Sequence, residues 1–272
     1  MSQPKRMIIT GVSPYVQRHF VNEHGNNVWE GCGPVAALML MSYYDKCLGY
    51  QKLIPKGDEG VTTTPDDLIQ DLRDRMKTIT VPGSLEGLTD PATFKSGLKG
   101  YVQDCGYDVD MDSYGSSDIG VSEDEVFDKS VSLIQSHHVH VLLLDWHDSG
   151  GNSVFPSHYV TVVGYNTHLT KRLIVCSGLP GDSDFQAVDF GDKSIKPVRA
   201  IWMTISSSAD GPKDGHEIGP ASTYSWKTVS GQQRLVPTVL EPPGTSGSTT
   251  WAPADSTTML AGSTCSINSW NS

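Results

Sequence analysis

Hydrophobic positions in the first half of the chain recur at helical spacing. Residues 33–48 are apolar on most sides, so we expect a central, buried helix there. The other helical repeats sit behind start signals such as the capping box of Ser122 and Glu125. Three further helices are therefore predicted, over residues 65–76, 94–105 and 123–134.

The spacing of the hydrophobic residues changes in the second half of the chain, from a helical repeat to short apolar runs. Residues 139–146 read VHVLLLDW, a continuous apolar run that is typical of a buried strand. Further strands, separated by turns rich in Gly, Asn, Ser and Pro, are predicted over residues 158–165, 172–176, 186–190 and 198–205. Helices followed by adjacent strands predict an α+β fold with an antiparallel sheet.

The composition changes near residue 206. From Ser206 to Ser272, Ser, Thr, Pro and Gly account for 35 of 67 residues. The same stretch keeps Trp226, Trp251 and Trp270, which a pure linker seldom does. We therefore expect a domain over residues 1–205 and an appendage over 206–272 that is irregular or partly disordered, with a strand or two on the domain.

Charge and composition narrow the function classes. The formal net charge of −11 and the sequence pI of about 5.1 disfavour nucleic acid as a partner, because an acidic surface repels phosphates. No apolar run has the length of a membrane helix or of a signal peptide's core. We expect no membrane insertion and a cytoplasmic location, with signal-less secretion or a removed leader left open.

The cysteines do not indicate a metal or redox site. The chain has five, and no two of them show CxxC spacing. A cluster at His137, His138 and His140 is more typical of a solvated turn than of a metal ligand set. We expect no cofactor and no metal, and we expect Cys47 and Cys105 to be inert thiols on apolar helix faces.

One cysteine lies in a context that favours chemistry. Cys32 stands in the sequence Gly-Cys-Gly-Pro directly before the long apolar helix. A thiol at a helix N-terminus is favoured as a thiolate by the helix dipole and by free N–H groups. The flanking Gly31 and Gly33 let a substrate approach the backbone closely and leave N–H groups for an oxyanion. Cys32 is therefore the candidate nucleophile.

A matching base lies far downstream. His158 opens the apolar strand HYVTVVGY, and a strand end holds a base rigidly. The order, with Cys32 on a helical half and His158 on a sheet half, suits nucleophilic catalysis by a thiol–imidazole pair.

These two motifs, GCGPVAALMLMSYYD and HYVTVVGYN, resemble the C39-like peptidases, a bacterial branch of the papain-like cysteine peptidases. The resemblance covers roughly residues 8–205, including the helix around TFKSGLKGYVQDCGY. It implies a papain-like fold whose site lies between the helical half and the sheet half. It also implies hydrolysis of a peptide or isopeptide amide through a thioester.

The resemblance implies two further roles. In the family, a glutamine upstream of the nucleophile donates its side-chain amide to the oxyanion. Gln17 in Pro-Tyr-Val-Gln matches this glutamine if residues 18–28 loop out. If they do not, Asn26 or Asn27 fills the role instead. An acid or amide after the next strand orients the histidine, but here that position is Ser177, with Asp182 close behind.

Other interpretations remain open at this stage. The same pair of residues serves deamidases, acyltransferases and transglutaminases, and Ser177 at the orienting position favours a catalytically inactive binding module. Asp145 and His147 end a strand near the expected cleft, where they line the substrate site or serve the structure. The substrate, the oligomeric state and the role of the appendage are not given by the sequence.

Overall fold

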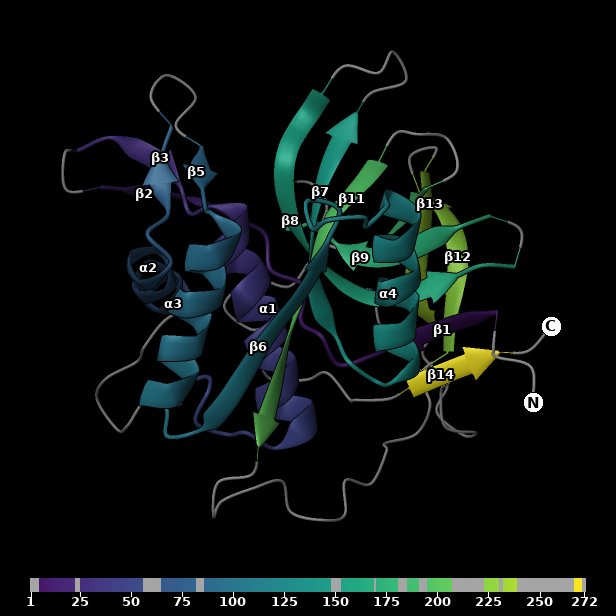
Figure 1. Ribbon diagram of the computed structural model, residues 1–272, viewed down its shortest axis with the longest axis horizontal. Coiled ribbons are helices and arrows are strands. Elements are labelled where there is room, and N and C mark those ends of the chain that lie inside the picture. The colour runs from purple at the N-terminus through teal and green to yellow at the C-terminus, as the bar shows by residue number, and fades with distance from the viewer. Residues whose placement is uncertain are drawn as a thin grey trace, which may run out of the picture.

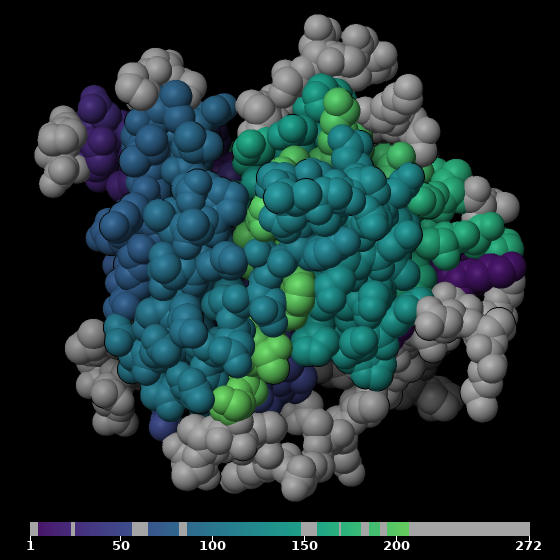
Figure 2. All heavy atoms as spheres, viewed as in Figure 1, coloured from purple at the N-terminus to yellow at the C-terminus, as the bar shows by residue number. Residues whose placement is uncertain are grey.

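The computed structural model describes residues 5–22, 25–55, 65–81, 86–147, 153–168, 170–180, 185–190, 195–206, 223–229, 232–238 and 267–270. Helices α1 (Cys32–Leu48), α2 (Pro65–Arg75) and α3 (Pro91–Asp104) lie together beside a large sheet, and α4 (Glu123–Gln135) lies over the sheet (Figure 1). In Figure 2 the helical half and the sheet half meet along a continuous seam.

The helices lie close to the predicted ranges, although α3 begins at Pro91, three residues before its predicted start. Their bounds are α1 Cys32–Leu48, α2 Pro65–Arg75, α3 Pro91–Asp104 and α4 Glu123–Gln135. The side chain of Ser122 accepts from the Glu125 N–H and Glu125 accepts in return, so the predicted capping box is present at α4. At α3, Asp90 caps the first turn, and Pro91 occupies the first helical position.

Ten strands of the described residues form one sheet, and all the pairings are antiparallel. The order is β12-β13-β10-β9-β8-β7-β11-β6, while β1 pairs with β8 and β14. Two small hairpins, β2–β3 and β4–β5, stand apart from this sheet. The strands are β1 Arg6–Ile9, β2 His19–Val21, β3 Asn27–Trp29, β4 Ile79–Thr80, β5 Gly87–Leu88, β6 Asp108–Gly115, β7 His140–His147, β8 Ser153–Asn166, β9 Arg172–Cys176, β10 Gln186–Asp189, β11 Ile195–Ser206, β12 Thr223–Val229, β13 Gln232–Thr238 and β14 Ile267–Trp270.

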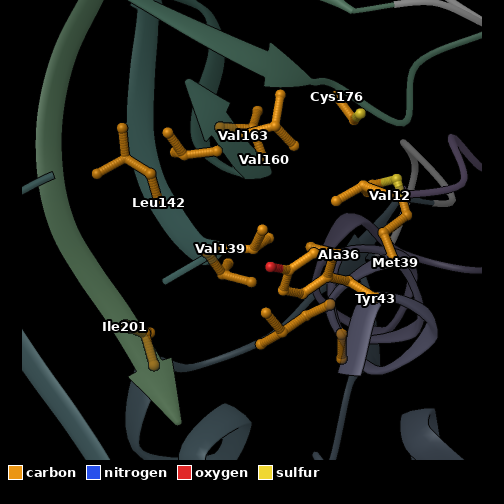
Figure 3. Close-up of a cluster of buried hydrophobic side chains, with 14 of the residues drawn as sticks. Val12, Ala36, Met39, Tyr43, Val139, Leu142, Val160, Val163, Cys176 and Ile201 are labelled. Atoms are coloured by element: carbon orange, nitrogen blue, oxygen red, sulfur yellow. The ribbon is translucent and has the colours of Figure 1, made fainter. Parts of the chain in front are cut away.

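The core lies between α1 and the sheet. Ala36, Met39 and Tyr43 on α1 face strand side chains that include Val160 and Val163 (Figure 3). Almost every residue of α1 is buried, as the all-round apolar pattern predicts. The helix that begins at the candidate nucleophile is therefore fixed in the middle of the protein.

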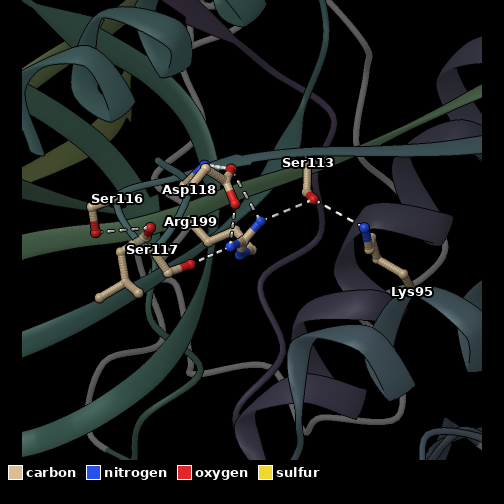
Figure 4. A network of polar contacts seen from close by, with 8 residues as sticks. Lys95, Ser113, Ser116, Ser117, Asp118 and Arg199 are labelled. Carbon is tan, nitrogen blue, oxygen red and sulfur yellow. Dashed lines mark hydrogen bonds and ion pairs between the residues drawn. The ribbon is translucent and has the colours of Figure 1, made fainter. Parts of the chain in front are cut away.

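A polar network joins the two halves at the edge of the sheet. Lys95 on α3 donates to Ser113 Oγ on β6 at 3.0 Å, and Arg199 on β11 donates to the same oxygen at 3.2 Å (Figure 4). Arg199 also pairs with Asp118 at 2.9 Å and donates to Ser117. The Arg199 guanidinium holds the pKa of Asp118 below its ordinary value. The network links α3 to β6 and β11, so it helps to fix the seam between the halves.

The predicted fold class is confirmed, because helices pack against an antiparallel sheet, although β1 and β6 of that sheet come before the last helix in the chain. The division at residue 206 stays a prediction. From the appendage, β12 and β13 join the sheet through β10, and β14 pairs with β1. One cysteine prediction is wrong, because Cys47 takes part in a disulfide, whereas Cys32, Cys105 and Cys176 are not disulfide-bonded.

A buried tyrosine gives a test of how α1 is anchored. The Tyr44 hydroxyl donates to the Met203 carbonyl of β11 at 2.6 Å. Tyr44→Phe leaves that buried carbonyl without its partner, so we expect a loss of about 1–2 kcal/mol in the free energy of unfolding, measured by urea denaturation. Tyr114→Phe on β6 is the matched control, and an equal loss in both variants contradicts the assignment.

Candidate active site

The turn before α1 requires its two glycines. Gly31 caps the helix with φ of 94°, a conformation that L side chains rarely adopt. A Cβ atom on Gly33 would lie 2.7 Å from Thr89 Oγ1, closer than van der Waals contact allows. Cys32 is thereby held at the first position of a buried helix, packed tightly against the segment that precedes α3.

The Cys32 thiol faces the middle of β8, which begins at Ser153, so His158 lies inside this strand and not at its start as predicted. The Cys32 sulfur accepts from the main-chain N–H of Tyr159, the residue after His158, and the side chain is partly exposed. Burial raises the pKa of the Cys32 thiol, while the N–H groups of Tyr159, Cys32 and Gly33 lower it. In this conformation desolvation outweighs the helix terminus, so the thiol is favoured over the thiolate that the sequence led us to expect.

His158 is buried with a defined tautomer. Its Nε2 lies 2.7 Å from the main-chain oxygen of Ser177. A carbonyl only accepts, so Nε2 carries the proton, and in the neutral ring the lone pair is on Nδ1. The preceding Ser157 has φ of 56°, and its N–H donates to the Asp145 carboxylate at 2.8 Å. Asp145 therefore stabilises the strained backbone of Ser157 within β8, directly before His158. This contact gives Asp145 a structural role beside the site.

Ser177 lies next to His158, as predicted, but its main-chain oxygen makes the contact with the ring. Its side-chain hydroxyl accepts from the Leu179 N–H at 3.2 Å. Because a carbonyl carries no full charge, it orients the ring but offers an imidazolium less stabilisation than a carboxylate. Asp182, the alternative orienting group, lies outside the described residues.

Gln17 lies beside these groups because the intervening residues form a hairpin. Strands β2 and β3 pair His19 with Trp29, which carries residues 18–28 outward and returns the chain to Cys32. The Gln17 N–H donates to the Gly178 oxygen at 2.9 Å, directly after Ser177. Asn26 and Asn27 lie at the far end of this hairpin and are exposed, so the structure separates them from the site.

A pocket of about 390 Å³ opens next to these residues. Thr89, on its wall, contacts Gly33 and accepts from the Tyr159 hydroxyl at 3.2 Å, and Ser157 adjoins His158. Ile79 and Leu88 on its rim are exposed by 60% and 45%, which is unusual for apolar side chains of this size. The pocket is lined by Lys77, Ile79, Leu88, Thr89, Asp90, Pro91, Thr93, Leu143 and Ser157.

Sequence reasoning missed several residues around the site. Thr89 and Glu30 lie around the Cys32 turn, and Tyr15 contacts Glu30. Tyr15 stands in the Pro-Tyr-Val-Gln motif, but sequence reasoning assigned a role to none of the three. The histidine cluster is elsewhere: His140 is fully buried, and burial lowers its pKa to about 3, so it is neutral. Among the described residues, no group of three His, Cys, Asp or Glu side chains is arranged to hold a metal ion.

The chain belongs to the Peptidase_C39 like family, whose profile matches residues 9–178, well over half of its length. The matched region contains Gln17, Cys32, His158 and Ser177. Membership supports a cysteine peptidase in general and implies a protein or peptide substrate.

No curated protein matches the chain. In the described residues, none of the helices has the length and apolar character needed to cross a membrane.

Two solved structures from Prevotella intermedia are similar to the chain. Active wild-type interpain A, a cysteine protease, is 11% identical with a TM-score of 0.47, covering 72% of this chain and 93% of interpain A. A prointerpain A fragment with a Cys-to-Ala substitution is 12% identical with the same TM-score, covering 72% of this chain and 71% of the fragment.

Proposed function

We propose that this protein hydrolyses peptide bonds with Cys32 as nucleophile and His158 as general base. The observation that carries the proposal is the tautomer of His158. Its Nε2–H is committed to the Ser177 carbonyl, so the basic nitrogen is Nδ1. The Cys32 sulfur accepts from the N–H of the next residue, Tyr159, which supports a thiol and an imidazole that lie side by side.

The burial of the thiol suggests how the reaction starts. Because desolvation raises the pKa of Cys32, the proton leaves when His158 accepts it as the sulfur attacks the scissile carbonyl. His158 then returns the proton to the leaving amine. A thioester remains, and water that gives its proton to His158 hydrolyses it, releasing the acid and restoring the thiol.

The developing oxyanion needs donors close to Cys32. The main-chain N–H of Cys32 at the open helix end is one, and the side-chain amide of Gln17 is the second. Support for Gln17 comes from its backbone, which the hairpin brings to the Ser177–Gly178 segment. The adjacent pocket would take an apolar substrate side chain, with the exposed Ile79 and Leu88 at its rim.

A binding module without activity is the second candidate, and one observation favours it. The orienting partner of His158 is a neutral carbonyl, which offers less stabilisation to an imidazolium than a carboxylate would. Peptide turnover distinguishes the two candidates. A peptidase loses its turnover when Cys32 is replaced, whereas a binding module has no turnover to lose.

The first experiment is digestion of a diverse peptide library, with products sequenced by mass spectrometry. We expect cleavage by the wild-type protein under reducing conditions, with large apolar side chains enriched at one fixed position beside the cleaved bond. A Cys32→Ser variant is the control. The proposal fails if the wild-type protein and this variant give the same product spectrum, and the pocket assignment fails if cleavage occurs without an apolar preference.

A further inference from the structure

A buried carboxyl group lies two residues before the nucleophile. Glu30 is only 2% exposed, and its side chain points back toward the segment that carries Gln17. Its Oε2 accepts from the Arg18 N–H at 2.7 Å, and its own N–H donates to the Arg18 oxygen at 3.0 Å. A carboxyl this buried is unusual unless it is well bonded, so its contacts need an explanation.

The hydrogen bonds around Gln17 fix it on both sides. Its own N–H is held by the Gly178 oxygen at 2.9 Å, and the next peptide N–H, that of Arg18, is held by Glu30. The first bond ties Gln17 to the segment that orients His158, and the second ties it to the turn that carries Cys32. Glu30 therefore sets how the Gln17 backbone lies relative to the nucleophile.

The phenol next to Glu30 shows how weakly one of its oxygens is bonded. The Tyr15 hydroxyl lies 2.7 Å from Asp66 Oδ1 and 3.4 Å from Glu30 Oε1, and it is the donor in both contacts. A phenol has one proton, and the shorter contact favours Asp66. Among the described contacts, Glu30 Oε1 therefore has no strong donor to stabilise a negative charge.

The charges near Glu30 agree with this. Burial and the Asp66 charge raise the pKa of Glu30, and the Arg18 N–H, the Arg18 guanidinium and the Tyr15 hydroxyl lower it, so that the net pKa is about 7. Arg73 on α2 faces the same turn, but its guanidinium donates to the main-chain oxygens of Trp29 and Glu30. No cation bonds directly to the Glu30 carboxyl among the described contacts.

We propose that Glu30 is a positioning residue that holds the oxyanion donor Gln17 against Cys32, and that it does so with a proton on Oε1. The inference rests on the proposed function, because it assigns Glu30 a role in that reaction. In this form Oε2 accepts from Arg18, and Oε1, which has only the long contact with Tyr15, carries the proton. When the pH rises above about 7, the proton leaves. A negative charge then appears near the oxyanion and weakens catalysis.

The test compares Glu30→Gln with Glu30→Ala. Glutamine keeps an acceptor for Arg18 and carries no charge, so it mimics the protonated carboxyl. For Glu30→Gln we expect kcat close to wild type at pH 6 and no decline above pH 7, where the wild-type kcat falls. For Glu30→Ala we expect kcat to fall about 10- to 100-fold with little change in KM, since misplacing a catalytic group by 1 Å can cost about 10²-fold.

Two further measurements separate positioning from general destabilisation. Glu30→Ala in a Gln17→Ala background should add little further loss, whereas additive losses overturn the proposal. Hydrogen exchange at the Arg18 amide needs no turnover: it should be slow in the wild-type protein and in Glu30→Gln and fast in Glu30→Ala. Unchanged exchange in Glu30→Ala rejects the role of Glu30. If Glu30→Ala loses the protection of the Arg18 amide as expected, but the wild-type protein does not cleave peptides, the proposed function is rejected and the positioning role of Glu30 is kept.

Discussion

Cys32→Ala is expected to reduce peptide hydrolysis by about 10⁴-fold or more, because covalent catalysis ends when the nucleophile is removed. The thiol lies at the first position of the buried helix α1, and its sulfur meets the strand that carries His158. The measurement is kcat/KM on the best peptide found in the library, with thermal unfolding recorded in parallel. Substrate binding should remain, since the substitution removes only a small side chain from the wall of the site.

The matched control is Cys105→Ala. Cys105 is also a free thiol that is partly exposed, and it lies at the end of α3. We expect this variant to keep full activity. If Cys32→Ala retains more than a few per cent of wild-type turnover, Cys32 is not the nucleophile, and the hydrolysis has another source.

The main elements could be predicted because their patterns are long and locally capped. The all-round apolar helix α1 and the continuous apolar strand β7 have no competing interpretation. Strands β4, β5 and β6 were missed because they lack such a local pattern. The two-residue strands β4 and β5 carry no period, and β6 (DVDMDSYG) alternates acidic residues on a strand whose inward face is only partly buried. These strands depend on partners that are distant in the sequence, and a local pattern does not reveal them.

The candidate site shows the same limit at the level of single residues. Cys32 and His158 stand in motifs whose chemistry depends on the side chain, so sequence reasoning finds them. The group on His158 Nε2 is a main-chain oxygen, which any residue at position 177 would supply, so the side chain found there is a poor guide. Glu30 escaped notice because its role depends on a hairpin that returns residue 30 to residue 18.

The structure corrects the expectation that the pKa of Cys32 is lowered. A helix N-terminus alone suggests a stabilised thiolate, and the main-chain N–H groups do lower the pKa of Cys32. The larger contribution is burial, which raises it and depends on the packing of β8 and the Thr89 segment around the turn. We therefore expect the reactivity of the thiol to depend on His158, which leads to a second prediction with a large effect.

His158→Ala should slow alkylation of Cys32 by iodoacetamide at pH 7 by about 10²-fold, within the range that general bases contribute. Under the proposed function the imidazole of the wild-type protein accepts the thiol proton, so we expect a fast reaction at neutral pH. In the variant the thiol must ionise alone, and burial holds its pKa above the ordinary value. Its alkylation should then become appreciable only in alkaline solution. Peptide mass spectrometry across pH 5–9 measures the rate for each cysteine separately.

Cys105 serves as the internal reference in the same samples, because burial also raises the pKa of its thiol. Its rate should be the same with and without His158. If Cys32 in the wild-type protein reacts no faster than Cys105, the thiol and imidazole do not act as a pair, and the inactive binding module becomes the better explanation. If Cys32 is fast in both proteins, the helix terminus activates it without His158, and the base must be sought among other groups around the Cys32 turn.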